Sequence, residues 1–239
     1  QTCALPILVD VLQRISEIAC ELPEVQELDI NPLLVDEDGV IAIDARVVVA
    51  PPKVSTARYG HMAIHPYPPE LEISWQLADG TDVQVRPIRP EDAEIEQYFV
   101  QNLSDESKYF RFMQSMDKLT PMMLARFTQI DYDREMALVA VIKEHTAQAR
   151  IISVARYVSN PDGQSCEFAL TVADAWQRKG IGSQLMQRLM TVARDRGIEI
   201  MEGEVLSTNI KMLRLCERLG FRSVHNREEP DVVVVRRHL

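Results

Sequence analysis

Apolar positions in the first fifty residues follow two different periods. Residues 8–20 carry apolar side chains three and four positions apart, which predicts an amphipathic helix. Two strand-like runs follow at 25–35 and 40–49, and the Asp38-Gly39 pair between them favours a tight turn. The pattern therefore predicts a helix followed by a β-hairpin.

Residues 50–70 interrupt this periodicity. They hold five prolines, at positions 51, 52, 66, 68 and 69. Proline favours extended conformations, so we interpret residues 51–70 as a semi-rigid linker between a small segment at 8–50 and a larger domain at 71–239.

Strand and helix patterns alternate after the linker. Strand patterns at 71–77 and 82–88 flank the turn signal Asp79-Gly80, and helix starts are indicated at Pro90 and at Thr120-Pro121. Further strands are predicted at 136–143, 150–158, 167–172, 199–206, 221–224 and 232–236, and further helices at 181–196 and 210–219. This order predicts an α/β (α+β) fold around a mixed sheet.

Composition narrows the class of protein. With 46% hydrophobic and 26% charged residues, the chain resembles an ordinary soluble globular protein, and no apolar run approaches the roughly 20 residues that span a bilayer. The formal charge is −10, and residues 1–70 contribute −7 of it, with 11 acidic and 4 basic side chains. An acidic balance argues against nucleic acid as the main partner, because Lys and Arg dominate phosphate-backbone binding.

Cysteine and histidine usage gives no metal site. The cysteines at positions 3, 20, 166 and 216 form no C-x-x-C pair, and no two histidines have metal-ligand spacing on a predicted helix. We expect no metal and reduced thiols in a cytoplasmic protein. The start Gln-Thr-Cys is not a signal peptide, and we expect the chain to be a fragment.

The segment 177–183, Gln-Arg-Lys-Gly-Ile-Gly-Ser, carries the clearest chemical signal. It follows a strand pattern and opens a helix, so its free backbone N–H groups suit an anion such as a pyrophosphate. Gly180 and Gly182 lack a Cβ and allow close approach. A P-loop would need Lys-Ser/Thr after Gly182, and a dinucleotide fingerprint would need glycine where Leu185 stands.

Two further motifs identify the ligand through a resemblance. Asn209 opens the following helix, Gly220-Phe221 ends it, and residues 85–92 read Val-Arg-Pro-Ile-Arg-Pro-Glu-Asp. Over about residues 82–238 these features, in order, resemble the GNAT-type N-acetyltransferases. The resemblance implies a mostly antiparallel sheet flanked by helices and acetyl-CoA as the acyl donor. The implied cofactor contacts are Leu170, Thr171, Val172, Gln177, Arg178, Lys179, Gly180, Ile181, Gly182, Ser183, Asn209 and Met212.

Acyl transfer to an amine needs a base, because a lysine amine with a pKa of about 10.4 arrives protonated. Glu167 heads the strand before the glycine loop, where similar acetyltransferases carry a catalytic glutamate, and it is our candidate; Glu135 is the reserve. Cys216 stands where many of these enzymes have a tyrosine that protonates the leaving thiolate. We expect Cys216 to be a small core residue, which leaves open whether water protonates the thiolate. The aromatic run at 109–113 is either core or one wall of the acceptor site.

Residues 25–49 carry a second resemblance. Glu27 to Leu34 and Ala42 to Arg46 look like the last hairpin of the ATP-grasp part of ADP-forming acyl-CoA synthetases, in which Asn31 and Asp44 would match magnesium ligands. The remaining ATP-binding parts are missing, so we expect no synthetase activity. The segment 8–50 is thus expected to be an ATP-grasp-like αββ remnant.

Such a segment before an acetyltransferase domain is the arrangement of bacterial Pat-type protein lysine acetyltransferases. By analogy, the expected partner is a protein acceptor bearing a target lysine, often an acyl-CoA synthetase, with no nucleic acid or membrane partner. A homo-oligomer is left open. The alternatives are a small-molecule amine acetyltransferase and a non-catalytic acyl-CoA sensor.

Overall fold

The computed structural model describes residues 4–36, 39–51, 65–143, 149–225 and 231–239. The chain forms two compact units, residues 1–66 and residues 67–239. The predicted linker at 51–70 lies largely outside the described residues. Its described end contains a short 3-10 helix, η1 (Pro69–Leu71), which belongs to the second unit.

The first unit is one helix and two short antiparallel strand pairs. The predicted helix is present as α1 (Ala4–Glu21). Each predicted long strand is divided in two, giving the pairs β1 (Val25–Ile30) with β4 (Ala45–Val49) and β2 (Leu33–Val35) with β3 (Val40–Ala42). Pro32 has no N–H to donate to a ladder, which explains the break after β1. The predicted turn residue Asp38 lies outside the described residues.

The second unit contains an eight-stranded sheet in the order β11-β12-β10-β9-β8-β7-β6-β5. All neighbours are antiparallel except β9 and β10, which are parallel. The strands are β5 (Ile73–Gln76), β6 (Asp82–Pro87), β7 (Glu135–Lys143), β8 (Ala149–Ser159), β9 (Ser165–Val172), β10 (Ile200–Leu206), β11 (Arg222–His225) and β12 (Val232–His238). The predicted mixed, mostly antiparallel sheet is confirmed.

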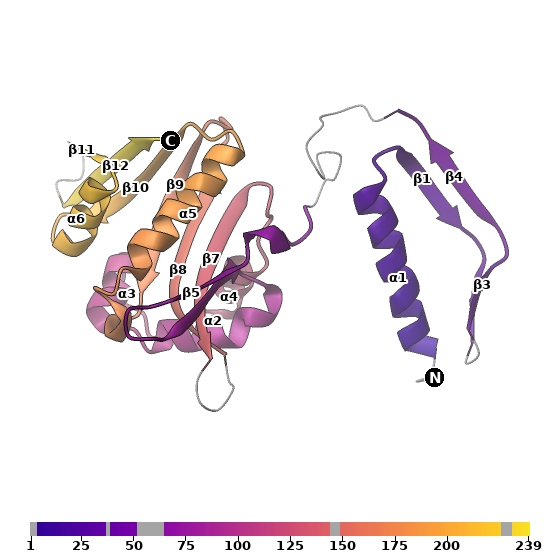
Figure 1. Ribbon diagram of the computed structural model, residues 1–239, viewed down its shortest axis with the longest axis horizontal. Helices are drawn as coiled ribbons and strands as arrows, with labels where there is room; N and C mark the ends of the chain where they lie inside the picture. Colours follow the sequence, from indigo (N-terminus) through magenta and orange to yellow (C-terminus); the bar gives the residue numbers. More distant parts are fainter. Residues whose placement is uncertain (1–3, 37–38, 52–64, 144–148, 226–230) are drawn as a thin grey trace. The chain divides into compact units, whose positions relative to one another are not determined.

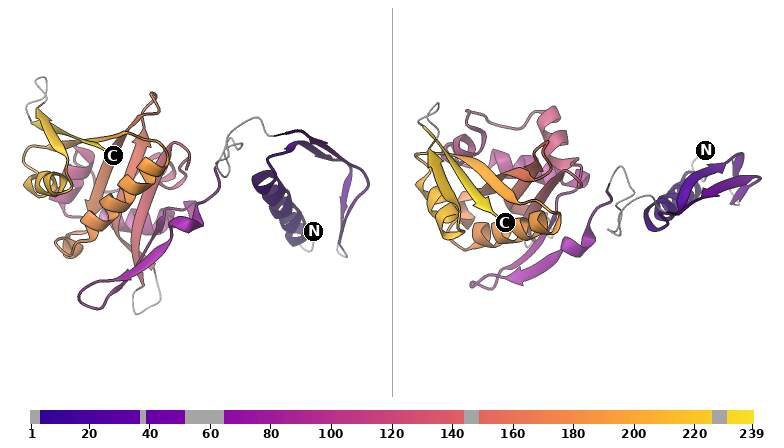
Figure 2. Two further views of the ribbon diagram at one scale, coloured as in Figure 1. Left: turned by 45° about the horizontal axis from the view of Figure 1, so that its top comes forward. Right: turned by 90° about the horizontal axis from the view of Figure 1, so that it is seen from above.

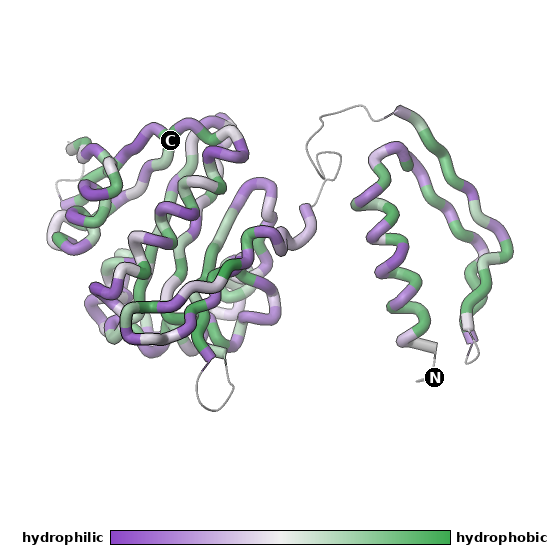
Figure 3. Tube along the Cα trace, in the orientation of Figure 1, coloured by the Kyte–Doolittle hydropathy of each residue, from purple (hydrophilic) through white to green (hydrophobic). Residues whose placement is uncertain are grey.

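Helices cover both faces of this sheet. Figures 1 and 2 show α5 (Ile181–Asp195) lying across one face and α2 (Ala93–Gln101), α3 (Asp105–Phe112) and α4 (Pro121–Thr128) on the other. Two cores result: one packs α5 and α6 (Ile210–Arg218) on the sheet, and the other packs α2 and α4. Hydrophobic and hydrophilic positions alternate along α5 in Figure 3, as an amphipathic helix requires. No helix among the described residues is long and apolar enough to cross a membrane.

The bounds of α3 were not predicted from the sequence. This helix is polar overall, so its apolar periodicity is weak. The sequence nevertheless carries a helix-start signal, with Ser104 followed by Asp105 and Glu106 in the first turn. In the structure the Ser104 hydroxyl caps the helix by accepting a hydrogen bond from the N–H of Ser107.

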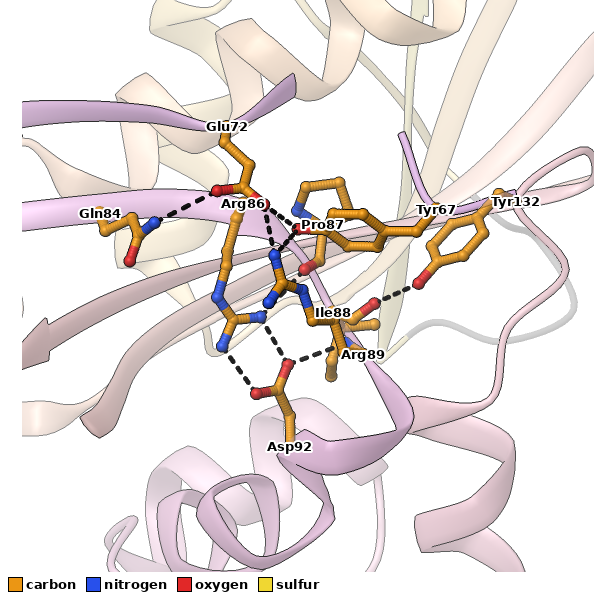
Figure 4. Close-up of polar contacts among 9 residues, drawn as sticks. All are labelled: Tyr67, Glu72, Gln84, Arg86, Pro87, Ile88, Arg89, Asp92 and Tyr132. Carbon is orange, nitrogen blue, oxygen red and sulfur yellow. Dashed lines mark hydrogen bonds and ion pairs between the residues drawn. The ribbon is translucent and has the colours of Figure 1, made fainter. Parts of the chain in front are cut away.

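A polar network holds the beginning of the second unit (Figure 4). The Tyr67 hydroxyl donates a 2.7 Å hydrogen bond to Glu72, and the Arg89 guanidinium lies 4.3 Å from the centre of the Tyr67 ring while pairing with Glu72. The Tyr67 and Tyr132 rings pack edge to face at 5.8 Å. Burial, followed by the bond to Glu72, raises the pKa of Tyr67 to about 12, so the hydroxyl keeps its proton. Tyr67 therefore belongs structurally to the second unit.

A buried ion pair lies beside this network. Both terminal nitrogens of Arg86 bind Asp92 at 2.7 Å, and the same carboxylate accepts a 2.8 Å hydrogen bond from the backbone N–H of Arg89. The bidentate geometry and the extra donor satisfy the buried charges. The pair joins β6 to the turn that starts α2.

Replacing Tyr67 with alanine should destabilise the second unit by about 2 kcal/mol, because a ring pair, a cation–π contact and a charged hydrogen bond are lost. The thermal unfolding temperature of this unit in the full chain should then fall by about 4–8 °C. Tyr109→Ala, at a half-exposed position on α3, is the control and should cause a much smaller shift. Equal shifts for both variants would contradict the anchoring role.

Candidate active site

The site is built where two parallel strands separate. The ladder between β9 and β10 has three pairs, Ser165 with Ile200, Cys166 with Met201 and Glu167 with Glu202. Beyond the last pair, β9 stays paired with β8 as far as Val172, and β10 stays paired with β12 as far as Leu206. Among the residues that the structure describes, one edge of β9 is thus left without a strand partner after Glu167.

An aromatic ring packs against β10 where the two strands part. Phe168 follows Glu167 and is buried, and its ring packs 5.1 Å from that of Phe221. A Cβ on Gly203 of β10 would lie only 2.7 Å from the Phe168 ring, so the ring already touches the backbone of β10. The ladder between β9 and β10 ends where this ring covers Gly203.

A cavity of about 750 Å³ opens between the separated strands. This volume falls in the range of small-molecule sites. Its walls come from five segments: α3, the second half of β9, the loop at 176–183, β10 and α6. The cavity therefore joins residues that are more than a hundred positions apart in the sequence.

The loop at 177–183 adopts the backbone that an anion site needs. Arg178 has φ 64° and Gly180 has φ 84°, and α5 begins at Ile181 with no side-chain cap. The first N–H groups of α5 therefore face the cavity region without an intrahelical partner. Gly180 has a left-handed backbone conformation. A Cβ at this position would meet no atom within 4 Å, but a residue with a Cβ would be strained in this conformation, so glycine is favoured.

Gly182 has a packing reason in addition to the one inferred from the sequence. A Cβ at this position would lie 3.2 Å from the side chains of both Leu170 and Val172. The glycine thus allows α5 to approach β9 closely, and it also lines the cavity.

Gln177 braces the loop. Its side-chain amide donates to the Val172 carbonyl at 3.3 Å, and its side-chain oxygen accepts from the Lys211 ammonium at 3.3 Å. The side chain therefore connects the end of β9 with α6. These bonds hold the turn that precedes the α5 N-terminus.

Asp174 is a supporting residue that the sequence analysis missed. Its carboxylate accepts hydrogen bonds from the Ser104 N–H, the Ser104 hydroxyl and the Ser107 hydroxyl at 2.7–2.9 Å. Burial opposes the charge, but these hydrogen bonds outweigh it and lower the pKa of Asp174. The interaction ties the N-terminus of α3 to the segment before the loop. Ser104 at the start of α3 was the available sequence signal, but it could not identify Asp174 as its partner, because the two residues are 70 positions apart.

Glu167 lines the cavity at the point where the strands separate. Partial desolvation by the cavity walls raises its pKa, followed by repulsion from Glu204 and Glu202, whereas Arg111 across the cavity lowers it. The balance is a carboxylate with a pKa above its ordinary value. Such a group is a stronger base than a free glutamate.

The cavity collects almost all predicted site residues. Those that line it are Glu167, Leu170, Thr171, Val172, Gln177, Arg178, Gly180, Ile181, Gly182, Ser183, Asn209 and Met212. Lys179 is the exception, since its ammonium binds Asp79 at 2.6 Å and lies 4.7 Å from the centre of the Trp176 ring. Asn209 has a structural task as well, because its side-chain oxygen accepts from the Met212 N–H and caps α6.

Two other candidates lie away from this cavity. Glu135, at the start of β7, is 3.6 Å from Arg126 and is absent from the cavity walls. Cys216 is 2% exposed and packs in the core, and desolvation raises its pKa to about 12. The expectation that Cys216 is a core residue agrees with this burial.

The aromatic run serves both purposes that the sequence left open. Phe110, Phe112 and Met113 line the cavity, and Phe112 also stacks on Phe127 in the core at 6.3 Å. Arg111 lies among them, and burial lowers its pKa to about 10. Buried Glu96 lies 3.7 Å from Arg156 and lines a small second cavity together with Arg111.

Adding a methyl group at Gly203 should test the contact between this residue and the Phe168 ring. Gly203→Ala should destabilise the second unit by about 1–3 kcal/mol, because the Phe168 ring must move within a packed core. Phe168→Leu in the same chain should relieve the clash, so the double variant should lose less than the sum of the single losses. Strictly additive losses in thermal unfolding would show that Gly203 and Phe168 do not press on each other.

Comparison with known proteins agrees with this geometry. Residues 97–221 match the model of the acetyltransferase (GNAT) family, and residues 1–49 match an ATP-grasp domain model. Over 42 residues, covering 18% of each chain, the sequence is 48% identical to the beta subunit of an ADP-forming acetate–CoA ligase of Pyrococcus furiosus.

The acetyltransferase part has longer matches. An acetyltransferase of Pseudomonas aeruginosa is 34% identical over 160 residues, which cover 67% of this chain and 86% of that protein. The acetyltransferase Pat of Mycolicibacterium smegmatis is 32% identical over 160 residues, but the match spans only 46% of its length. The crystal structure of the GNAT domain of S. lividans PAT superposes with a TM-score of 0.66 at 32% identity, covering 73% of this chain and all of that one. The chain belongs to the GNAT family of acetyltransferases.

Proposed function

We propose that this chain transfers an acetyl group from acetyl-CoA to the side-chain amine of a lysine in another protein, with Glu167 as the general base. The observation that carries the proposal is the position of Glu167, a carboxylate of raised pKa at the apex of the cavity between β9 and β10. GNAT acetyltransferases use acetyl-CoA, and the same cavity offers an anion site and an open strand edge.

The chain has a group for each part of acetyl-CoA. The N–H groups at the start of α5 suit the pyrophosphate. The unpaired edge of β9 at Leu170–Val172 can bind the amides of the pantetheine arm as a neighbouring strand would. An arm lying along this edge would direct the thioester towards Glu167.

In the proposed reaction the lysine ammonium first loses a proton, and the acetyl group is then transferred from sulfur to nitrogen. Glu167 takes a proton from the lysine ammonium, directly or through water, and leaves a neutral amine. The amine nitrogen attacks the thioester carbonyl, so a C–N bond forms, the C–S bond breaks and the nitrogen loses its second proton to water. Coenzyme A leaves as a thiolate that water protonates, since Cys216 is buried in the core away from the cavity walls.

The acceptor class rests on the relatives. Pat of Mycolicibacterium smegmatis and the S. lividans PAT domain match residues of the second unit, and the first unit resembles part of an acyl-CoA synthetase. A synthetase-like enzyme is therefore the first acceptor to test. Self-association into a homo-oligomer stays a prediction.

Labelled acetyl-CoA and mass spectrometry separate the alternatives. Label on a lysine of the acceptor enzyme supports the proposal, and label on small amines alone would indicate a small-molecule acetyltransferase. Binding of acetyl-CoA without any transfer would indicate a sensor.

Glu167→Gln should lower turnover about 10²–10⁴-fold, because the amide keeps the shape of the side chain but cannot accept the ammonium proton. The dissociation constant for acetyl-CoA should stay nearly unchanged. Glu135→Gln, away from the cavity, is the matched control and should retain turnover. Near-normal turnover of Glu167→Gln with intact binding would reject the base assignment.

The pH dependence should reveal the second carboxylate, Glu204. Glu167 acts only when ionised, so kcat/KM should fall as the pH drops through its raised pKa. Glu204→Gln removes a like charge, which lowers that pKa and moves the acidic limb of the profile to lower pH. Glu70→Gln, at an exposed position on η1, should leave the limb in place. An unmoved or upward-shifted limb in Glu204→Gln would contradict the coupling.

A further inference from the structure

The cavity has a second cationic feature besides the α5 N-terminus. Lys211, Arg214 and Arg218 stand three, four and seven positions apart on α6, so they share one face of the helix, and all three line the cavity. All three are exposed, while Cys216 on the other side of α6 is buried. We call these three residues the α6 basic face. It stands out in a chain with a formal charge of −10.

The α6 basic face begins next to the loop at 177–183. The Lys211 ammonium lies 3.3 Å from the side-chain oxygen of Gln177, the first residue of that loop. With a rise of 1.5 Å per residue, Arg214 follows about 4.5 Å and Arg218 about 10 Å further along the helix axis. The basic face therefore leads away from the loop along one wall of the cavity.

The two arginines are available for an anion. Within the part of the chain that the structure describes, neither Arg214 nor Arg218 forms an ion pair or a side-chain hydrogen bond. The other charged groups on this stretch of the wall are Glu217 on α6 and Arg178 in the loop. Three cations on α6 against one carboxylate leave the wall positive.

We propose that the α6 basic face binds the 3′-phosphate on the ribose of acetyl-CoA. This inference rests on the proposed function and adds the recognition of a second, separate phosphate. Coenzyme A carries this phosphomonoester on the adenosine, next to the pyrophosphate, so a cavity that takes the pyrophosphate at α5 must place it near by. Arginine forks match phosphate oxygens in bidentate geometry. The chain therefore discriminates acetyl-CoA from its analogue without the 3′-phosphate.

Calorimetry with acetyl-CoA and 3′-dephospho-acetyl-CoA tests the proposal on the full chain. The unmodified chain should bind acetyl-CoA about 10–100-fold more tightly, since hydrogen bonds to charged groups contribute on that scale. The double variant Arg214→Gln with Arg218→Gln should lose most of this preference by weakening acetyl-CoA alone. Its affinity for the dephospho analogue should stay within about twofold. Arg194→Gln, on α5 and outside the cavity walls, is the control and should keep the full preference.

Each contrary result has its own meaning. Equal affinity for the two compounds in the unmodified chain would overturn this inference and leave the proposed function standing. An unchanged preference in the double variant, with slower acetylation of a protein acceptor, would overturn it in favour of an acidic acceptor surface on α6. Failure to bind either compound would overturn both this inference and the proposed function. A thermal unfolding profile like that of the unmodified chain shows that the double variant is folded.

Discussion

The separation of β9 from β10 is the constraint on which the rest of the site depends. Three parallel pairs hold the strands together, and the ladder ends where the Phe168 ring packs on Gly203. The separation creates the cavity, exposes the edge of β9 and places Glu167 at the apex. A sheet that continued to pair would bury the same residues under a regular ladder and leave no room for a ligand.

The second requirement is a helix whose N-terminus meets this opening. Gly182 lets α5 approach Leu170 and Val172 so closely that the start of the helix is fixed against the open strand. The preceding turn is strained, because Arg178 is held at positive φ, which costs about 1–2 kcal/mol for a residue with a Cβ. Gln177 and Asp174 form hydrogen bonds around the turn that offset this strain. The anion site is therefore built before any ligand arrives.

Local patterns revealed much of this arrangement from the sequence. The glycine loop, the helices after it and the strand that carries Glu167 are written in consecutive residues, and all were predicted within a few positions. Contacts between distant residues were beyond such patterns. Nothing near Lys179 indicates that its charge is neutralised by Asp79, one hundred positions earlier. Likewise, no local pattern around Phe168 predicts its contact with Gly203, because only the fold brings the two residues together. The split strands of the first unit had a local signal in Pro32, which the strand-like composition around it outweighed.

The position of Cys216 bears on which half of the acid–base chemistry the protein must supply. Deprotonating a lysine ammonium of pKa about 10.4 at pH 7 costs about 4–5 kcal/mol. The thiol of coenzyme A is a stronger acid than this ammonium, so its release as a thiolate costs less. In the proposed reaction the larger cost falls on the amine, and Glu167 is the group we propose to meet it, because its raised pKa improves proton acceptance. The smaller cost needs no side chain, because water can protonate a thiolate after it leaves. A core cysteine at position 216 is thus compatible with full catalysis as long as Glu167 stays ionised in the cavity.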